Sequence, residues 1–194
     1  MAESRTLQIV GFAGSLRAAS YNRALLRAAL EMAPPTLRIQ IETLDGVPLF
    51  NEDVEARGMP DAVAALRRAI AAADGVLIAT PEYSHGTTGV LKNALDWLSR
   101  PPRPPVLNGR PVALMGATPG MTGTARSQEQ TRQTLTALGA LTMMETEFLL
   151  GQAREKFDAE GRLTDAPTRE KLVRFLGSFA AWIGKMPGPQ RETR

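Results

Sequence analysis

DGVLIATPEYSHGTTGVLKNALDWLSR, residues 74–100, joins two hydrophobic patterns of different period through a loop that contains proline and glycine. Residues 74–80 contain an unbroken apolar run, which is typical of a strand buried on both faces. Residues 87–100 carry apolar side chains such as Leu91 and Leu95 at helical spacing. The loop therefore lies where a strand ends and a helix begins, and ligands bind at such positions in open parallel sheets.

Segments of the two kinds alternate along the rest of the chain. The expected strands are residues 6–13, 37–43, 74–80, 111–117 and part of 141–150. The expected helices are residues 22–32, 60–73, 87–100, 124–138 and 168–183. This alternation predicts an α/β fold, a doubly wound parallel sheet with helices on both faces.

The length of 194 residues predicts a single domain. We expect an ordered core over about residues 6–185 and a disordered tail at residues 186–194. No apolar run approaches the roughly 20 residues of a membrane span, and the N-terminus lacks the apolar core of a secretory signal. These features predict a cytoplasmic protein that does not bind membranes.

The composition excludes several kinds of chemistry. The chain has no cysteine, so disulfides, thiolate catalysis and thiolate-bound metals are impossible. His85 is the only histidine, which rules out a multi-histidine metal site. No Gly-x-Ser-x-Gly motif is present to supply a serine nucleophile. Any redox chemistry therefore needs a bound cofactor, and we expect no metal site.

The formal net charge is +3 at pH 7. This charge reflects either a solvated, arginine-rich surface or an attraction to ligands that carry phosphate. No run of basic residues has aromatic residues interleaved with it, so we do not expect the protein to bind nucleic acid.

The loop GSLRAASYN, residues 14–22, follows the first expected strand. It matches neither the P-loop pattern nor the Gly-x-Gly-x-x-Gly dinucleotide fingerprint. Its glycine, hydroxyls, amide and guanidinium, beside a helix N-terminus, are suited to holding a phosphate group. The alternative is purely structural, because Ser20 or Asn22 would also serve as the N-cap of the helix.

Residues 14–22 and 81–97 together resemble the motifs of the NAD(P)H-dependent FMN reductase family, whose members include quinone, azo and chromate reductases. The resemblance runs from about Leu7 to Leu149 and includes three ligand loops. It implies FMN as cofactor and a flavodoxin-like, five-stranded sheet in the order 2-1-3-4-5. The residues that it implies for binding the FMN phosphate are Ser15, Arg17, Ser20 and Asn22.

The second loop is implied to wrap the ribityl chain and the ring of FMN. The residues carried over from the family motif are Pro81, Glu82, Tyr83, Ser84 and His85. Tyr83 offers an aromatic edge or face to the ring. The family commonly has Asn at Ser84, Ser at Gly86 and Pro at Thr88. Ser84 can still form hydrogen bonds, but with less reach, and Gly86 and Thr88 predict a looser loop. His85 is either an exposed loop residue or part of the face where nicotinamide or the acceptor stacks.

The third loop, residues 116–126, is implied to pass near the flavin ring, with Thr118 and Gly120 as its neighbours. Thr124 stands where the family usually has the second glycine of a pair, and it alternatively serves as a helix N-cap. Phe50 is expected either to cover the substrate pocket of its own or a partner subunit, or to anchor a long loop to the core.

The resemblance implies an FMN-dependent NAD(P)H oxidoreductase with ping-pong kinetics. Hydride would pass from NADPH or NADH to FMN N5, and the electrons would then pass to a quinone, an azo compound, a metal oxyanion or free flavin. FMN carries this chemistry, so no catalytic side chain is assigned. The family also implies a homodimer or homotetramer. Two alternatives stay open: a flavodoxin-type electron carrier, and a non-catalytic binding or regulatory protein with the same fold.

Overall fold

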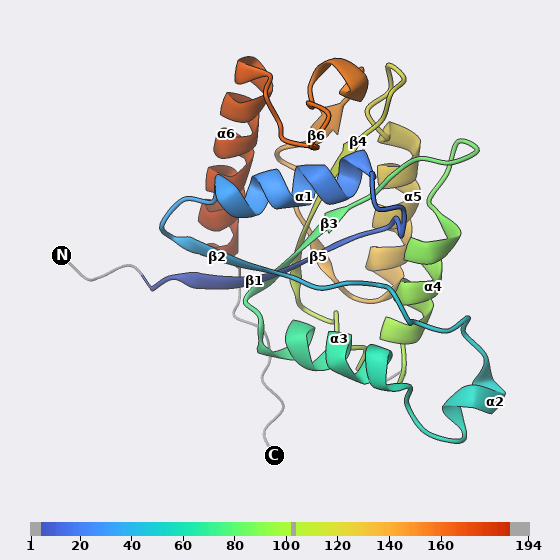
Figure 1. Ribbon diagram of the computed structural model, residues 1–194. Coiled ribbons are helices and arrows are strands. Elements are labelled where there is room, and N and C mark those ends of the chain that lie inside the picture. The colour runs from blue at the N-terminus through green and yellow to red at the C-terminus, as the bar shows by residue number, and fades with distance from the viewer. Residues whose placement is uncertain (1–4, 102–103, 187–194) are drawn as a thin grey trace.

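The computed structural model describes residues 5–101 and 104–186, and Figure 1 shows their arrangement. The strands are β1 (Leu7–Ala13), β2 (Leu37–Ile41), β3 (Gly75–Ala79), β4 (Pro111–Ala117), β5 (Leu141–Thr142) and β6 (Phe148–Leu150). The helices are α1 (Tyr21–Glu31), α2 (Glu52–Glu55), α3 (Asp61–Ala72), α4 (Gly89–Leu98), α5 (Ala125–Ala137) and α6 (Ala166–Ile183), with a 3₁₀ helix, η1, at Ala153–Glu155. The tail expected to be disordered lies outside the described residues, apart from Met186.

The sheet has the order β2-β1-β3-β4-β5, and every neighbouring pair is parallel. This order confirms the expected flavodoxin-like fold. The chain leaves β1 toward one edge of the sheet and returns through β3 on the other side of β1. The ends of β1 and β3 therefore form a topological switch point, where open α/β sheets bind their ligands.

The expected last strand, residues 141–150, is two strands rather than one. β5 pairs with the start of β4 and β6 pairs with its end, so the sheet has six strands. Residues 143–147 lie between them, with Met143 buried and Met144 and Glu147 exposed. Glu147 forms an ion pair with Arg132 of α5 at 2.9 Å. Because the charged side chains of Glu145 and Glu147 stay in solvent, the chain leaves the sheet edge and rejoins it at Phe148.

Helices cover both faces of the sheet, as the continuous apolar strands predict. One core cluster joins α1 and α6 to the sheet, and the other joins α3, α4 and α5 to it. Side chains alternate between the clusters along a strand: Leu77 belongs to the first, whereas Val76 and Ile78 belong to the second. Figure 1 shows the two helical layers with the sheet between them.

The five expected helices are present with termini shifted by up to two residues, and one further helix is present. The short helix α2 was not expected, and the Asn51 side chain caps it by accepting a hydrogen bond from Asp53 N at 2.8 Å. α6 begins at Ala166 instead of residue 168, because Asp165 is its N-cap and accepts from Thr168 N at 3.0 Å. Over residues 5–101 and 104–186, no helix is long and apolar enough to cross a membrane.

Phe50 is anchored to α4. Its backbone N–H donates to Asn93 Oδ1 at 2.7 Å, and its ring packs edge-on against Trp97 with the ring centroids 5.0 Å apart. Trp97 Nε1 donates to the carbonyl of Pro48 at 2.8 Å, which fixes the same loop a second time. These contacts favour the interpretation of Phe50 as an anchor for the long loop before α2.

Candidate functional site

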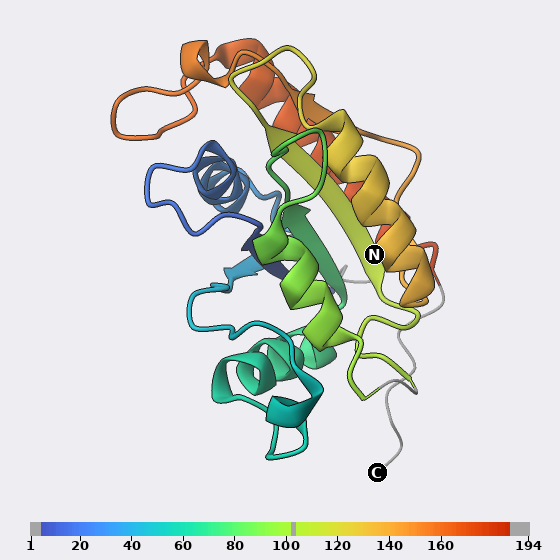
Figure 2. The same ribbon diagram turned by 90° about the vertical axis from the view of Figure 1, so that its right-hand side faces the viewer.

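A pocket of about 380 Å³ lies at the carboxyl ends of β1, β3 and β4. Its lining consists of Arg17, Ser20, Tyr21, Asn22, Pro81, Glu82, Tyr83, Ala117, Thr118, Pro119 and Arg154. Figure 2 shows that the loops following these three strands gather at one end of the sheet. The volume falls within the roughly 300–1,000 Å³ of small-molecule and cofactor sites.

The structure brings most of the predicted site residues together. Those that line the pocket are Arg17, Ser20, Asn22, Pro81, Glu82, Tyr83 and Thr118, and those that do not are Ser15, Ser84, His85 and Gly120. Sequence reasoning missed Tyr21, Ala117, Pro119 and Arg154. Tyr21, Ala117 and Pro119 adjoin predicted residues or predicted loops and so had a sequence signal, whereas Arg154 had none.

Ser20 and Asn22 both have structural partners in the first loop. Ser20 Oγ accepts hydrogen bonds from the N–H groups of Asn22 at 3.2 Å and Arg23 at 3.4 Å, so it is the N-cap of α1. The side chain of Asn22 donates to the carbonyl of Ala117 at 2.8 Å and accepts from the N–H of Ala117 at 2.9 Å. Asn22 therefore joins the start of α1 to the end of β4, while the hydroxyl proton of Ser20 can still be donated to a ligand.

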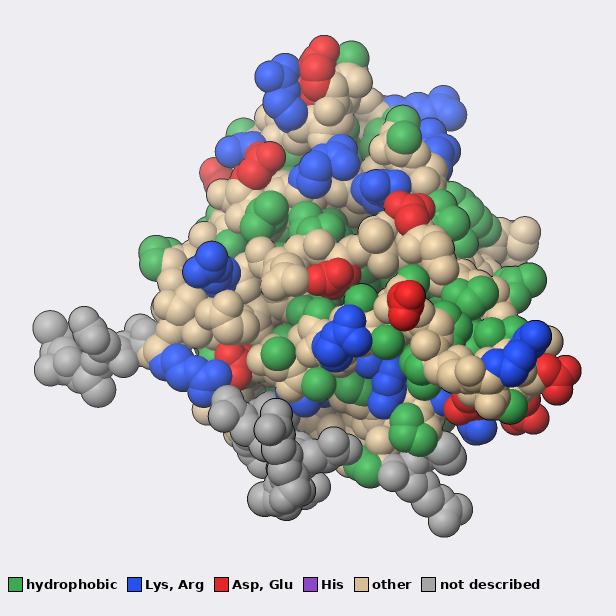
Figure 3. All heavy atoms as spheres, turned by 60° about the horizontal axis from the view of Figure 1, so that its bottom comes forward, with side chains coloured by type: hydrophobic (Ala, Val, Ile, Leu, Met, Phe, Trp, Pro, Cys, Tyr) green, Lys and Arg blue, Asp and Glu red, His purple; other side chains and the backbone are tan. Residues whose placement is uncertain are grey.

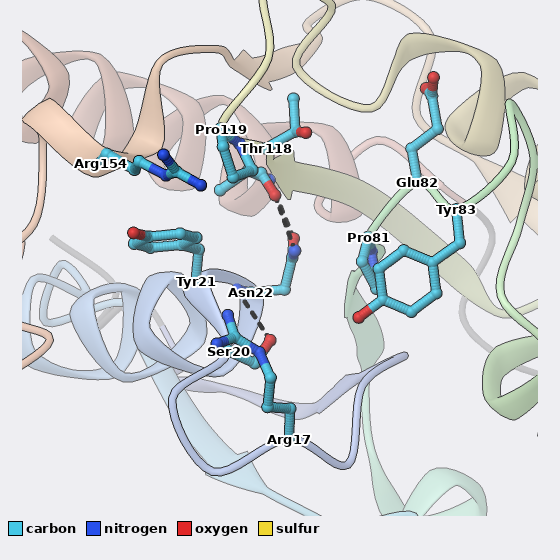
Figure 4. A pocket seen from close by; sticks show the side chains of 11 residues that line it. Arg17, Ser20, Tyr21, Asn22, Pro81, Glu82, Tyr83, Thr118, Pro119 and Arg154 are labelled. Atoms are coloured by element: carbon cyan, nitrogen blue, oxygen red, sulfur yellow. Dashed lines mark hydrogen bonds between the residues drawn. The ribbon is translucent and has the colours of Figure 1, made fainter.

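Arg17 and Tyr21 form one wall of the pocket. The Arg17 guanidinium lies over the Tyr21 ring, 6.0 Å from its centroid, and Tyr21 packs in turn against Phe157. Arg154 enters from η1, and Figure 4 shows its guanidinium directed toward the pocket beside Tyr21. Within the described part of the chain, neither arginine forms an ion pair. The wall is therefore positively charged and suited to an anionic ligand.

Glu82 contributes little negative charge to the pocket, because its carboxylate is bound to the start of α5. It accepts hydrogen bonds from Arg126 N at 3.1 Å and Ser127 N at 3.4 Å, and it forms an ion pair with Arg126 Nη1 at 3.1 Å. In Figure 4 the carboxylate points away from Asn22 and the pocket centre. A carboxylate at a helix N-terminus is stabilised by the helix dipole, so Glu82 fastens α5 to the second loop.

Ser84 and His85 form the tip of a tight hairpin. Tyr83 N donates to Gly86 O at 3.1 Å and Gly86 N donates to Tyr83 O at 3.0 Å. The φ angles of Ser84 and His85 are +48° and +62°, as in a type I′ turn. Asn tolerates this left-handed conformation better than Ser does, which gives a physical reason for the family's preference at this position. His85 borders a second cavity, of about 550 Å³, on the outer side of α5.

The second loop is held by several contacts at the positions that depart from the family. Thr88 Oγ1 donates to the carbonyl of Gly14 at 2.7 Å and accepts from Leu91 N at 3.2 Å, so it caps α4 and binds the first loop. Thr87 N donates to Gln130 Oε1 at 3.0 Å. A Cβ atom at Gly86 would lie 2.6 Å from the same Gln130 oxygen, so glycine permits this close packing on α5.

Thr124 replaces the second family glycine without capping α5 through its side chain. It stands at the N-cap position with φ +71° and is fully buried. Its Oγ1 accepts from Gln128 Nε2 at 3.2 Å instead, and it occupies the space that a side chain at Gly116 would need. Gly120 lies outside the pocket lining, and its carbonyl accepts from Gln152 N at 2.8 Å.

The fold and the pocket define a flavodoxin-like protein with a pocket suited to an anionic ligand at the switch point. Residues 7–155 match the family described as NADPH-dependent FMN reductase, and the chain belongs to that family. It is 44% identical over 185 residues to an NAD(P)H-dependent FMN reductase of Pseudomonas aeruginosa, covering 95% of this chain and 100% of that protein. It is 38% identical over 186 residues to a quinone reductase of Escherichia coli K12, covering 94% and 98%.

Solved structures agree with this assignment. FerB, a flavoenzyme NAD(P)H:(acceptor) oxidoreductase from Paracoccus denitrificans, superposes with a TM-score of 0.85 at 32% identity, over 93% of this chain and 99% of that one. An NADH:FMN oxidoreductase in its apo form shares the fold with a TM-score of 0.61 at 20% identity, over 94% and 92%. The chain is therefore an NAD(P)H-dependent FMN reductase or quinone reductase, with FMN as its cofactor. The two guanidinium groups and the volume of the pocket fit a ligand that carries both a phosphate and a ring.

Proposed function

We propose that the pocket binds FMN and that the protein reduces a small-molecule acceptor with NAD(P)H as the electron donor. A quinone is the first acceptor that we propose. The observation that carries this proposal is one pocket with a cationic wall at Arg17 and an exposed aromatic side chain at Tyr83. FMN, when bound, accepts hydride from nicotinamide and passes electrons on to the acceptor. A relative from a Burkholderia species, 37% identical over 177 residues, is named 2-hydroxy-1,4-benzoquinone reductase, which supports quinones as the first acceptors to test.

The residues divide between the two ends of this proposed site. Toward the phosphate, Arg17 supplies charge and Ser20 a hydroxyl proton, with Ser15 beside them on the same loop and Asn22 holding α1 in place. The residues proposed to place the ring are Pro81, Tyr83, Ser84, His85, Thr118 and Gly120, and Glu82 holds their loop against α5. Glu82 and Asn22 thus act by positioning other groups.

We propose a ping-pong order, because reduced nicotinamide and the acceptor both need the exposed face of the flavin ring. Reduced nicotinamide and the acceptor would then occupy the same space in turn, next to Tyr83. Initial rates measured with NADPH and 1,4-benzoquinone should give parallel double-reciprocal lines. Intersecting lines would show that both substrates bind together and would contradict this order.

The reductive half-reaction separates this function from its two rivals. The protein loaded with FMN is mixed anaerobically with NADPH, and separately with NADH, while the visible flavin absorbance is followed. We expect rapid bleaching by at least one nucleotide, followed by recovery when benzoquinone is added. Bound flavin that stays oxidised with both nucleotides would indicate an electron carrier. A protein that rejects FMN would indicate the non-catalytic alternative.

We also propose that residues 1–194 form one domain, which acts in the cytoplasm as a homodimer or homotetramer. Leu49, with 82% of its surface exposed beside the anchored Phe50, is a candidate contact with a second copy. Light scattering after size exclusion measures the mass directly, and a monomer at micromolar concentration would contradict the proposal.

On the face in Figure 3, basic and acidic side chains are interspersed, with no continuous basic patch.

A further inference from the structure

Arg154 reaches the pocket from a part of the chain that carries no recognised ligand motif. It lies in η1, within residues 151–165, a segment between β6 and α6. Figure 2 shows this segment, in orange, extending at the same end of the sheet as the loop after β1. The pocket therefore receives one arginine from each side, Arg17 from the first loop and Arg154 from η1.

The backbone around Arg154 is fastened to the third loop. Ala153 N donates to the carbonyl of Thr118 at 3.0 Å, and Gln152 N donates to the carbonyl of Gly120 at 2.8 Å. Ala153 is completely buried. These contacts keep the base of the Arg154 side chain at the pocket wall, and Figure 4 shows the guanidinium directed inward from there.

The charge around Arg154 is not balanced by the protein. Other cations of the same segment have carboxylate partners: Lys156 pairs with Asp165 at 3.1 Å and Arg162 with Asp158 at 2.7 Å. Over residues 5–101 and 104–186, Arg154 and Arg17 have no such partner, and Glu82, the acidic residue that lines the pocket, is bound to Arg126. Two guanidinium groups that face one pocket without a counter-charge are suited to a doubly charged oxyanion.

We propose that Arg154 is a second phosphate-binding residue, which acts with Arg17 on the phosphate monoester of a nucleotide ligand. The proposal rests on the proposed function, because it places that ligand in the same pocket. The monoester is either the 5′-phosphate of FMN or the 2′-phosphate that distinguishes NADPH from NADH. Both are dianionic groups of the kind that a guanidinium binds through paired hydrogen bonds.

The test compares Arg154→Gln with Arg17→Gln and with a matched control, Arg174→Gln. Arg174 lies on α6, its side chain is 70% exposed, and it does not line the pocket. The apoprotein of each is titrated with FMN and with riboflavin, which lacks the phosphate, and flavin fluorescence gives the dissociation constant. We expect Arg154→Gln to weaken FMN binding about tenfold, as for loss of one charge-assisted hydrogen bond. Riboflavin binding should change less than about twofold, and Arg174→Gln should alter neither.

A conservative variant and a series of salt concentrations show how much of the contribution of Arg154 to FMN affinity comes from its charge and how much from the shape of its guanidinium. Arg154→Lys keeps the charge, so it should recover part of the FMN affinity that Arg154→Gln loses. The FMN affinity of the wild type should fall with added salt more steeply than that of Arg154→Gln, because screening weakens exposed charges. Thermal unfolding of each variant shows that the fold is retained.

Comparing NADPH with NADH shows whether the phosphate bound by Arg154 belongs to FMN or to NADPH. Unchanged FMN affinity in Arg154→Gln, with a raised KM for NADPH and an unchanged KM for NADH, would assign Arg154 to the 2′-phosphate. Unchanged values for FMN, NADPH and NADH would overturn the proposal. Flavin that binds but is not reduced by either nucleotide would contradict the reductase function. The comparison of FMN with riboflavin would still test the role of Arg154 in that case.

Discussion

At the scale of single residues, Asn22 shows how a polar side chain at a ligand site can act through its neighbours. Its amide makes two hydrogen bonds with the backbone of Ala117, and Asn22 is 3% exposed. Water cannot readily replace these bonds, because both partners are buried. The amide therefore keeps the first and third loops of the pocket in register, whatever ligand lies between them.

Replacing Asn22 by Ala should lower the free energy of unfolding by about 2–4 kcal/mol, because the N–H and carbonyl of Ala117 both lose their partner. Urea unfolding at pH 7 measures the change. Gln133→Ala, on the exposed face of α5, is the control and should stay within about 0.5 kcal/mol of the wild type. An Asn22→Ala protein as stable as the wild type would show that the amide serves a ligand instead of the fold.

At the scale of the elements, short polar contacts connect loops to the starts of nearby helices. Thr88 caps α4 and binds the first loop, Glu82 holds the start of α5, and Asp165 caps α6. Each contact stabilises a helix terminus, where backbone N–H groups lack partners inside the helix. Side chains from the loops thus cap or hold the starts of three helices, α4, α5 and α6.

Thr88→Ala should lower the free energy of unfolding by about 1–2 kcal/mol, since it removes a helix cap and a buried hydrogen bond to Gly14. Thr88→Ser keeps the hydroxyl and should retain most of that stability. Denaturant midpoints of the two variants, at equal slope, test this difference. Equal losses in both variants would mean that the Thr88 methyl group, and not its hydroxyl, matters.

Acid should weaken the segment that carries Arg154. Hydrogen bonds from the Thr168 hydroxyl and from Lys156 hold the pKa of Asp165 below its usual 3.8, and a hydrogen bond from Arg162 N lowers the pKa of Asp158. The folded state thus binds these protons less readily than the unfolded state does. The stability they contribute is present above about pH 4 and is lost as the pH falls through the lowered values.

Asp165→Asn tests this pH dependence, because Asn retains the capping function and cannot titrate. Urea unfolding from pH 7 down to pH 2.5 should show the wild type losing more stability than the variant below pH 4. Parallel pH profiles of the two proteins would contradict a lowered pKa at Asp165. Asp45→Asn, at an exposed position of another loop, is a matched control.

At the scale of the whole molecule, α6 completes a core that the family match does not include. The match ends at residue 155, whereas α6 spans Ala166–Ile183 and covers one face of the sheet. A Cβ atom at Gly75 would lie 3.1 Å from Phe179 Cζ, so the helix packs closely on β3. The last helix is therefore part of the fold and not an appendage.

Phe179→Ala should lower the free energy of unfolding by about 3–5 kcal/mol, because Phe179 is fully buried and its loss leaves a cavity. Val173→Ala, on the exposed side of the same helix, should change stability by less than about 1 kcal/mol. Urea unfolding of both variants measures the contrast. Similar small losses in the two would show that α6 packs loosely against the sheet.

Local patterns predicted much of this architecture. The apolar run at residues 74–80 and the helical spacing after it depend on side chains a few positions apart, so the strand, loop and helix could be predicted. The break within residues 141–150 was not predictable in the same way, because it depends on where along β4 the chain pairs with it again. The contacts of the second loop were not predictable either, since Thr87 and Gly86 pack on Gln130, far along the sequence.

The amino-acid sequence by itself determined the parallel α/β class and the positions of the three loops, because hydrophobic period and turn residues act over short distances along the chain. Tertiary structure alone decided what each polar group does. Asn22 forms its hydrogen bond with Ala117, and Glu82 its ion pair with Arg126, only once the sheet has assembled. The same holds for Arg154, which then lines the same pocket as Arg17. Hydrogen bonds and ion pairs act over a few ångströms, and folding, not sequence order, brings such groups within reach.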